Sequence, residues 1–218
     1  MRKRFLPLLL LTGAMFAYAP VMIARAPYES TMLLVQKIFY FHVPSWFAMF
    51  TGVFVAGVAG VLYLARNDTR GDRVAVSAAE IALMFGAMGL TSGPIWARKA
   101  WGVFWQWDAK LTIALLLELI FVAYLLLRKY GGAGSEKLAA AVALFGMAVV
   151  PFVWQAVNIW RTIHPNTNVI PSLQAGMAQP FWFCVTTFLL FFLVLLALRV
   201  RVERLHADLD ELYRAEEL

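Results

Sequence analysis

Residues Ile95–Thr112 read IWARKAWGVFWQWDAKLT and lie between two long apolar runs. This tryptophan segment contains half of the eight tryptophans of the chain, Trp96, Trp101, Trp105 and Trp107, together with basic and acidic side chains. An aromatic segment of mixed charge at the edge of a bilayer is typical of an interfacial belt. It is equally typical of a platform for a large, flat ligand. The remaining sequence has to distinguish the two.

The composition indicates a membrane protein. Of the 218 residues, 62% are hydrophobic and 15% are charged, whereas soluble domains are roughly 45–50% apolar. The net charge of +6 does not indicate nucleic-acid binding, because the basic residues form short clusters between apolar runs and not one face of a soluble domain. The single cysteine, Cys184, allows no internal disulfide and no cysteine-based metal site. The CxxCH motif of covalent heme attachment is absent.

Six apolar runs of about 17–22 residues predict six transmembrane helices, because this length crosses roughly 30 Å of hydrocarbon. The predicted spans are residues 5–23, 45–65, 74–95, 111–127, 138–157 and 181–200. The predicted fold is therefore an all-α membrane protein with one six-helix domain, residues 1–200. Residues 96–110 form a loop between the third and fourth spans, and residues 201–218 form a charged, amphipathic tail.

The first apolar run also resembles a signal peptide. It follows three basic residues, and Ala-Tyr-Ala at residues 17–19 resembles a cleavage site. Pro20 would directly follow the cut, and the apolar run continues beyond it. We therefore expect this segment to be retained as a membrane anchor.

The basic residues predict the orientation. With the N-terminus inside, 13 of the 19 lysines and arginines lie on the inner side. The other six lie outside: Arg25, Lys37, Arg98, Lys99, Lys110 and Arg161. Because basic residues favour the cytoplasmic side, we expect both termini to be cytoplasmic and the tryptophan segment to face outward.

Two of the three histidines fall on the same side as the tryptophan segment. His42 lies at the outer end of the second span in KIFYFHVPSW, and His164 lies in the last outer loop in WRTIHPNTN. A lone interfacial histidine is most simply a polar cap, but two beside an aromatic segment indicate a ligand site. Two histidines do not complete a closed zinc site, whereas two axial imidazoles suit a porphyrin. His206 is expected to be solvated.

Several other residues have two interpretations. Glu80 and Glu118 fall within spans, where a carboxylate is costly, so each serves either a structural hydrogen bond or a proton or heme path. The nearby basic residues are either interfacial anchors or partners for porphyrin propionates: Arg98, Lys99, Lys110 and Arg161. The remaining tryptophans are expected to be belt residues: Trp46, Trp96, Trp154, Trp160 and Trp182. Trp160 is the one that alternatively lines a pocket beside His164.

Three motifs together resemble a known family. WGVFWQWDAKLT is similar to the WWD signature, WGxxWxWDxRLT, of heme-handling proteins in cytochrome c maturation. KIFYFHVPSW and WRTIHP are similar to the two histidine motifs of the heme exporter protein C (CcmC) family. The order of the motifs across six spans also agrees, and the resemblance covers nearly the whole chain.

The resemblance implies that His42 and His164 are the axial ligands of a transiently bound, non-covalent heme b. It implies a heme platform formed by Trp101, Gly102, Trp105, Trp107 and Asp108. Two residues depart from the signature, since Phe104 replaces a common tryptophan and Lys110 replaces the usual arginine. Lysine keeps the charge but loses bidentate pairing, so these departures affect partner contact more than heme binding.

The resemblance also implies a bacterial inner-membrane protein that is not an enzyme. It would present heme at the periplasmic face to a heme chaperone, the E protein, beside the A and B subunits of an ABC transporter and a small single-span D protein. Two alternatives remain, a heme-containing electron carrier and a permease that moves heme through the bundle. The first is disfavoured because no histidine falls in the core of a predicted span. The second is disfavoured because no broken helices occur in matching halves.

Overall fold

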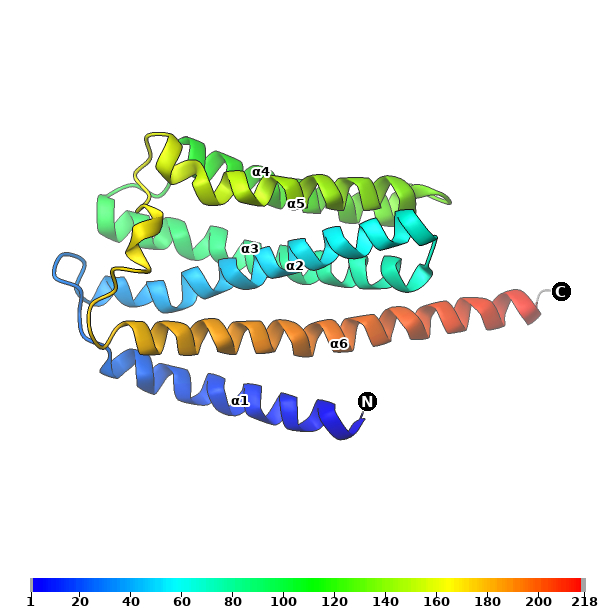
Figure 1. Ribbon diagram of the computed structural model, residues 1–218, viewed down its shortest axis with the longest axis horizontal. Helices are drawn as coiled ribbons and strands as arrows, with labels where there is room; N and C mark the ends of the chain where they lie inside the picture. Colours follow the sequence, from blue (N-terminus) through cyan, green and yellow to red (C-terminus); the bar gives the residue numbers. More distant parts are fainter. Residues whose placement is uncertain (1, 217–218) are drawn as a thin grey trace.

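The computed structural model describes residues 2–216, and these form a bundle of long helices (Figure 1). The elements are α1 (Arg2–Arg25), the 3₁₀ helix η1 (Leu34–Ile38), α2 (Phe39–Arg66), α3 (Thr69–Trp101), α4 (Ala109–Tyr130), α5 (Ser135–Ile159), the 3₁₀ helix η2 (Thr167–Val169) and α6 (Ala178–Glu216). Within the described residues, six helices are long and apolar enough to cross a membrane. The predicted all-α fold with six spans is confirmed.

The helices extend beyond the predicted apolar runs, and local capping marks several of their ends. α2 begins at Phe39, before the predicted start at residue 45, and ends where Asn67 adopts a left-handed conformation with φ 53°. α3 begins after Asp68, whose side chain accepts a hydrogen bond from the backbone N–H of Arg70 at 2.9 Å. Asp and Asn are favoured at these cap positions.

The predicted tail continues the last span as one helix. α6 runs without interruption through residue 200 to Glu216 and projects beyond the other helices (Figure 1). Its projecting part exposes the apolar side chains of Leu205, Leu209, Leu212 and Tyr213. Residues 217–218 of the predicted tail lie outside the described residues.

The helices pack around a central pair, α2 and α3. α2 also contacts α5 and α6, α4 packs on α3 and α5, and α1 packs on α6. Small side chains allow this close packing: a Cβ atom at Gly52 of α2 would lie 2.9 Å from the Cβ of Ala82 in α3. Figure 1 shows both termini at one end of the bundle, with the α2–α3 and α4–α5 turns. The connections α1–α2, α3–α4 and α5–α6 lie at the opposite end, called here the loop end.

Candidate functional site

The tryptophan segment is partly helical, which corrects the predicted loop of residues 96–110. α3 continues through Trp101 and α4 begins at Ala109, so the irregular part is residues 102–108. Gly102 ends α3 with a φ of 81°, a backbone conformation that residues other than glycine rarely adopt. Asp108 begins α4, because its Oδ1 accepts a hydrogen bond from the backbone N–H of Leu111 at 2.9 Å.

A cavity of about 150 Å³ lies at the loop end, where α2, α3, α4, α5 and the α5–α6 connection meet. Both His42 and His164 contribute to its wall. Nine of the other wall residues are aromatic: Phe39, Trp46, Phe47, Phe50, Trp96, Trp101, Phe104, Trp105 and Trp154. The structure therefore brings both predicted histidines together with three of the four tryptophans of the tryptophan segment.

His42 is buried in the first turn of α2 and is oriented from α3. Its Nδ1 lies 2.9 Å from the hydroxyl oxygen of Ser92. That hydroxyl already donates its proton to the carbonyl of Met88 at 2.7 Å, so it accepts a hydrogen bond from Nδ1. The proton of the neutral imidazole therefore resides on Nδ1, and Nε2 carries the lone pair that a metal ion requires.

His164 has the same tautomer as His42, but a different hydrogen-bond partner fixes it. Its Nδ1 lies 2.8 Å from the carbonyl oxygen of Pro165, which can only accept, so Nδ1 carries the proton. Burial, with the positive charge of Lys110 as a second cause, lowers the pKa of His164 to about 4. The ring is therefore neutral at pH 7. Both histidines thus offer Nε2 as a metal-binding nitrogen.

The tryptophans of the segment divide between the wall and the outer surface. The prediction that Trp96 belongs to an interfacial belt is wrong, because only 8% of it is exposed and it packs edge-on against His42 at 5.7 Å. Its Nε1 and that of Trp105 are buried without a hydrogen-bond partner among residues 2–216. Trp107, by contrast, is 75% exposed and packs edge-to-face on Trp105. Buried unpaired donors are costly, so a ligand with acceptor atoms would satisfy them.

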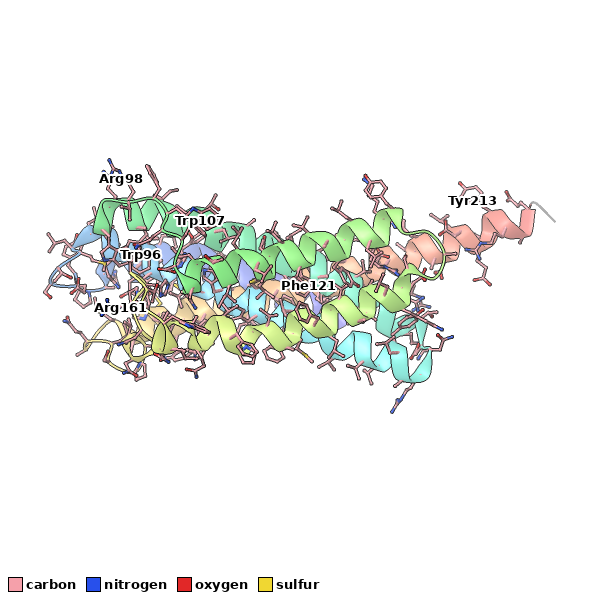
Figure 2. All side chains as sticks on the ribbon, turned by 90° about the horizontal axis from the view of Figure 1, so that it is seen from above. Trp96, Arg98, Trp107, Phe121, Arg161 and Tyr213 are labelled. Carbon is pink, nitrogen blue, oxygen red and sulfur yellow. The ribbon has the colours of Figure 1, made fainter. Side chains whose placement is uncertain are left out.

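The four candidate propionate partners also divide. Lys110 lines the cavity, and its Nζ donates to the carbonyl of Val153 at 2.7 Å. Arg98 lies over the ring of Phe104 at 5.5 Å and donates to the carbonyl of Gly102. Lys99 and Arg161 are exposed, and Figure 2 shows Arg98 and Arg161 at the loop end. Of the four, Lys110 is the one that contributes to the cavity wall.

Asp108 links the tryptophan segment to the loop that carries His164. Its Oδ2 accepts hydrogen bonds from the hydroxyl of Thr162 at 2.5 Å and from the backbone N–H of Ile163 at 3.2 Å. Asp108 itself is not part of the cavity wall. Its carboxylate therefore binds the neighbouring loop, and Thr162 is a residue of the site that the sequence analysis did not identify.

No cluster of three or more histidine, cysteine or acidic side chains that could hold a metal ion occurs in the described part of the chain. The metal-binding capacity of the loop end therefore rests on the two imidazoles. Two nitrogen ligands with flat apolar walls match an iron that is already held in the plane of a porphyrin. They do not match a bare divalent ion, which needs more protein ligands.

The fold and the cavity define a polytopic, six-helix membrane protein with a histidine-bearing aromatic pocket at one end. The comparison with known proteins identifies it further: the chain belongs to the heme exporter protein C (CcmC) family, whose family model matches residues 1–214. The resemblance inferred from the three motifs is confirmed.

Individual relatives agree along most of the chain. It is 30% identical over 179 residues to heme exporter protein C of Bradyrhizobium diazoefficiens, covering 79% of this chain and 68% of the relative. It is 28% identical to the proteins of the same name from Haemophilus influenzae, covering 79% and 72%, and Escherichia coli K12, covering 76% and 69%. These relatives are named for export, a handling role and not a catalytic one.

Proposed function

We propose that this protein binds heme b non-covalently through His42 and His164 and delivers it for the maturation of c-type cytochromes. One observation carries the proposal: both imidazoles line the same aromatic cavity, and both hold their proton on Nδ1. Nε2 of each ring is therefore the nitrogen that ligates the iron. Hydrogen bonds of this kind to the second ring nitrogen are the usual means of orienting a histidine ligand.

The size of the cavity supports partial enclosure of the porphyrin. Its volume of about 150 Å³ is below the roughly 300–1,000 Å³ of pockets that surround a whole ligand. Trp101 and Trp105 supply wall for the ring faces, and Gly102 lets the chain turn between them. The ring of Phe104 belongs to the wall and is also exposed, and the exposed ring of Trp107 lies outside the cavity, so the aromatic surface continues beyond it. Partial enclosure favours a protein that presents heme to a recipient over one that retains it for electron transfer.

The basic residues have separate roles in this proposal. Lys110 pairs with a propionate by exchanging its hydrogen bond to the carbonyl of Val153, at a charge-assisted strength that a neutral carbonyl does not provide. Arg98, Lys99 and Arg161 are exposed at the loop end, where they favour the approach of an acidic surface or of the second propionate. The chain itself makes and breaks no covalent bond; it binds, orients and releases.

The lysine and arginine bias supports a cytoplasmic location of both termini and a periplasmic loop end in a bacterial inner membrane. Residues 1–200 would form the heme-handling domain and residues 201–218 a cytoplasmic tail. The family supports a recipient of the heme chaperone type, the E protein. The A and B subunits of an ABC transporter and the single-span D protein would complete the assembly, in contact with membrane lipid and with no nucleic acid.

The ligand assignment is tested by an optical spectrum of the purified, full-length protein after heme is added. We expect a six-coordinate, low-spin, bis-histidine spectrum in the wild type. His42→Ala and His164→Ala should each abolish it, whereas His206→Ala, in the projecting part of α6, should leave it unchanged. Wild-type spectra in both single variants would exclude this pair of ligands.

Transfer is tested by adding the apo form of the E chaperone to the heme-loaded protein. The proposal predicts that the bis-histidine spectrum of this protein decreases as the chaperone acquires heme. If the heme stays and is reversibly reduced and oxidised, the electron carrier is supported instead. If transfer occurs only when heme is supplied on the side of the termini, the permease is supported.

A further inference from the structure

The two histidines of the cavity are held in different ways. His42 belongs to α2, and its ring is fixed by Ser92 of α3, the helix that α2 contacts most extensively. His164 lies in the connection between α5 and α6, outside any α-helix. Its position therefore depends on the side-chain contacts of that connection.

Those contacts lead to Asp108. The backbone N–H of His164 donates to the hydroxyl oxygen of Thr162 at 3.0 Å, and this hydroxyl donates to Oδ2 of Asp108 at 2.5 Å. The N–H of Ile163 donates to the same oxygen at 3.2 Å. The other oxygen, Oδ1, caps α4 through Leu111. One carboxylate thus joins the tryptophan segment, the start of α4 and the backbone of His164.

We propose that Asp108 is a positioning residue that holds His164 against the heme iron through Thr162, and that His164 is consequently the first ligand to dissociate on release. The proposal rests on the proposed function, because it concerns how the same site lets its cargo go. It assigns Asp108 the role of positioning the ligating histidine, His164, and not that of forming part of the aromatic heme platform.

The surface next to Asp108 shows how a recipient would act on this connection. Trp107 precedes Asp108 and is 75% exposed at the loop end (Figure 2), so a docking protein can contact it directly. A displacement of residues 102–108 moves Asp108. Because Thr162 and Ile163 are hydrogen-bonded to its carboxylate, they are displaced with it. The ring of His42 is bonded to Ser92 in the helical bundle and does not follow this movement. The iron therefore loses His164 while it is still held by His42.

The test uses the full-length, heme-loaded protein and a pair of substitutions at one position. Thr162→Val removes the hydroxyl with little change of shape, and Thr162→Ser restores it. Ser172→Ala is the matched control, because its hydroxyl lies in the same connection but bonds to the backbone of Asn168. Asp108→Asn provides a second variant that keeps an acceptor for the cap of α4.

Added imidazole reports how firmly His164 is held. In Thr162→Val and Asp108→Asn, we expect imidazole to replace a protein ligand at a concentration at least about tenfold lower than in the wild type, as is common when a ligand loses its supporting hydrogen bond. The resulting spectrum should match that of His164→Ala with imidazole. Thr162→Ser and Ser172→Ala should behave like the wild type, and a thermal melt should show that all variants fold.

Two outcomes would overturn the inference. One is wild-type imidazole sensitivity in both Thr162→Val and Asp108→Asn. The other is a product spectrum that matches His42→Ala with imidazole, since His42 would then be the weaker ligand. The proposed function fails separately, if the wild type itself shows no bis-histidine heme.

Discussion

The guanidinium of Arg199 donates two hydrogen bonds to the carboxylate of Glu80, one of them from Nη2 to Oε1 at 2.8 Å, and so joins α6 to α3. Glu203, one turn further along α6, lies 2.6 Å from Nη1 of the same guanidinium. Glu80 had two interpretations from the sequence, a structural bond or part of a proton or heme path. The ion pair favours the structural interpretation, because a carboxylate within an apolar helix needs a partner of this kind.

We therefore predict energetic coupling between Glu80 and Arg199. Glu80→Ala and Arg199→Ala should each lower the free energy of unfolding. The double variant should lower it by less than the sum of the two single effects, with a coupling energy of about 1 kcal/mol. Denaturant unfolding of the wild type and the three variants in detergent measures the four free energies of unfolding. Glu211→Ala, in the exposed part of α6, should be neutral, and strictly additive losses would contradict the pairing.

The position of Glu118 in α4 leads to the prediction that α3 requires glycine at residue 86. Its side chain is buried, and Oε2 has no hydrogen-bond partner among residues 2–216. A Cβ atom at Gly86 would clash with this oxygen. We expect Gly86→Ala to cost about 1–3 kcal/mol of stability, as overpacking commonly does.

Gly13→Ala is the control for Gly86→Ala, because a Cβ atom there meets nothing within 4 Å. A thermal melt followed by tryptophan fluorescence should show a lower midpoint for Gly86→Ala alone. The double variant Gly86→Ala with Glu118→Ala should tolerate the new methyl group better than the single variant does. An unchanged midpoint in Gly86→Ala would mean that the carboxyl group of Glu118 moves aside without cost and that α3 does not require glycine here.

The sequence predicted the helices well, and it placed His42 and His164 near the tryptophan segment, because both inferences depend on local signals. An apolar run of sufficient length defines a span whatever its neighbours are. The two histidines stand in short motifs that can be recognised without knowledge of the tertiary structure. The prediction for Trp96 failed because Gly102, and not the end of the apolar run, terminates α3. The extra turn carries Trp96 inward against His42. Such packing is a tertiary property that hydropathy does not contain.

The polar residues that orient the site could not be predicted in the same way. Ser and Thr in apolar helices commonly bond to a carbonyl of their own helix, as Thr51 and Thr187 do here. Ser92 makes that bond as well and in addition accepts from His42, which only the packing of α2 on α3 reveals. Asp108 was different, since an aspartate before an apolar run is a recognisable helix start. Its second oxygen, however, bonds a loop 54 residues away.

Ser92 leads to a prediction about affinity. Ser92→Ala removes the acceptor that fixes the proton of His42 on Nδ1, so the ring can rotate or change tautomer. We expect heme affinity to fall by about 10–100-fold, the usual effect of losing a partner of a ligating histidine. Titration of heme into the apoprotein measures this loss, and Ser92→Thr should largely restore the affinity. Thr91→Ala is the adjacent control, because that hydroxyl bonds to the carbonyls of its own helix. Equal affinities of Ser92→Ala and the wild type would show that Ser92 does not orient the ligand.

Glu29 makes the local stability of the α1–α2 connection, at the loop end, dependent on pH. Its Oε2 accepts hydrogen bonds from the hydroxyl of Thr31 at 2.6 Å, from the N–H of Met32 at 2.7 Å and from the N–H of Thr31 at 2.9 Å. These bonds, that of the Thr31 hydroxyl first, lower the pKa of Glu29 to about 2. Because the folded pKa lies below the unfolded value, the carboxylate stabilises this turn fully above about pH 4.5. The contribution disappears as the pH falls from there through about 2.

Hydrogen exchange of the Thr31 and Met32 amides, corrected for intrinsic rates, tests this expectation. Protection should be constant from pH 7 to about pH 5 and should decrease steadily below it, following the loss of the ionised carboxylate. Glu29→Gln should show lower protection at pH 7 and little further change on acidification, because the amide accepts the same bonds without the charge that strengthens them. Glu211→Gln, at an exposed position of α6, should leave both amides unaffected. Protection of the wild-type turn that falls already between pH 7 and pH 6 would assign its pH dependence to a group other than Glu29.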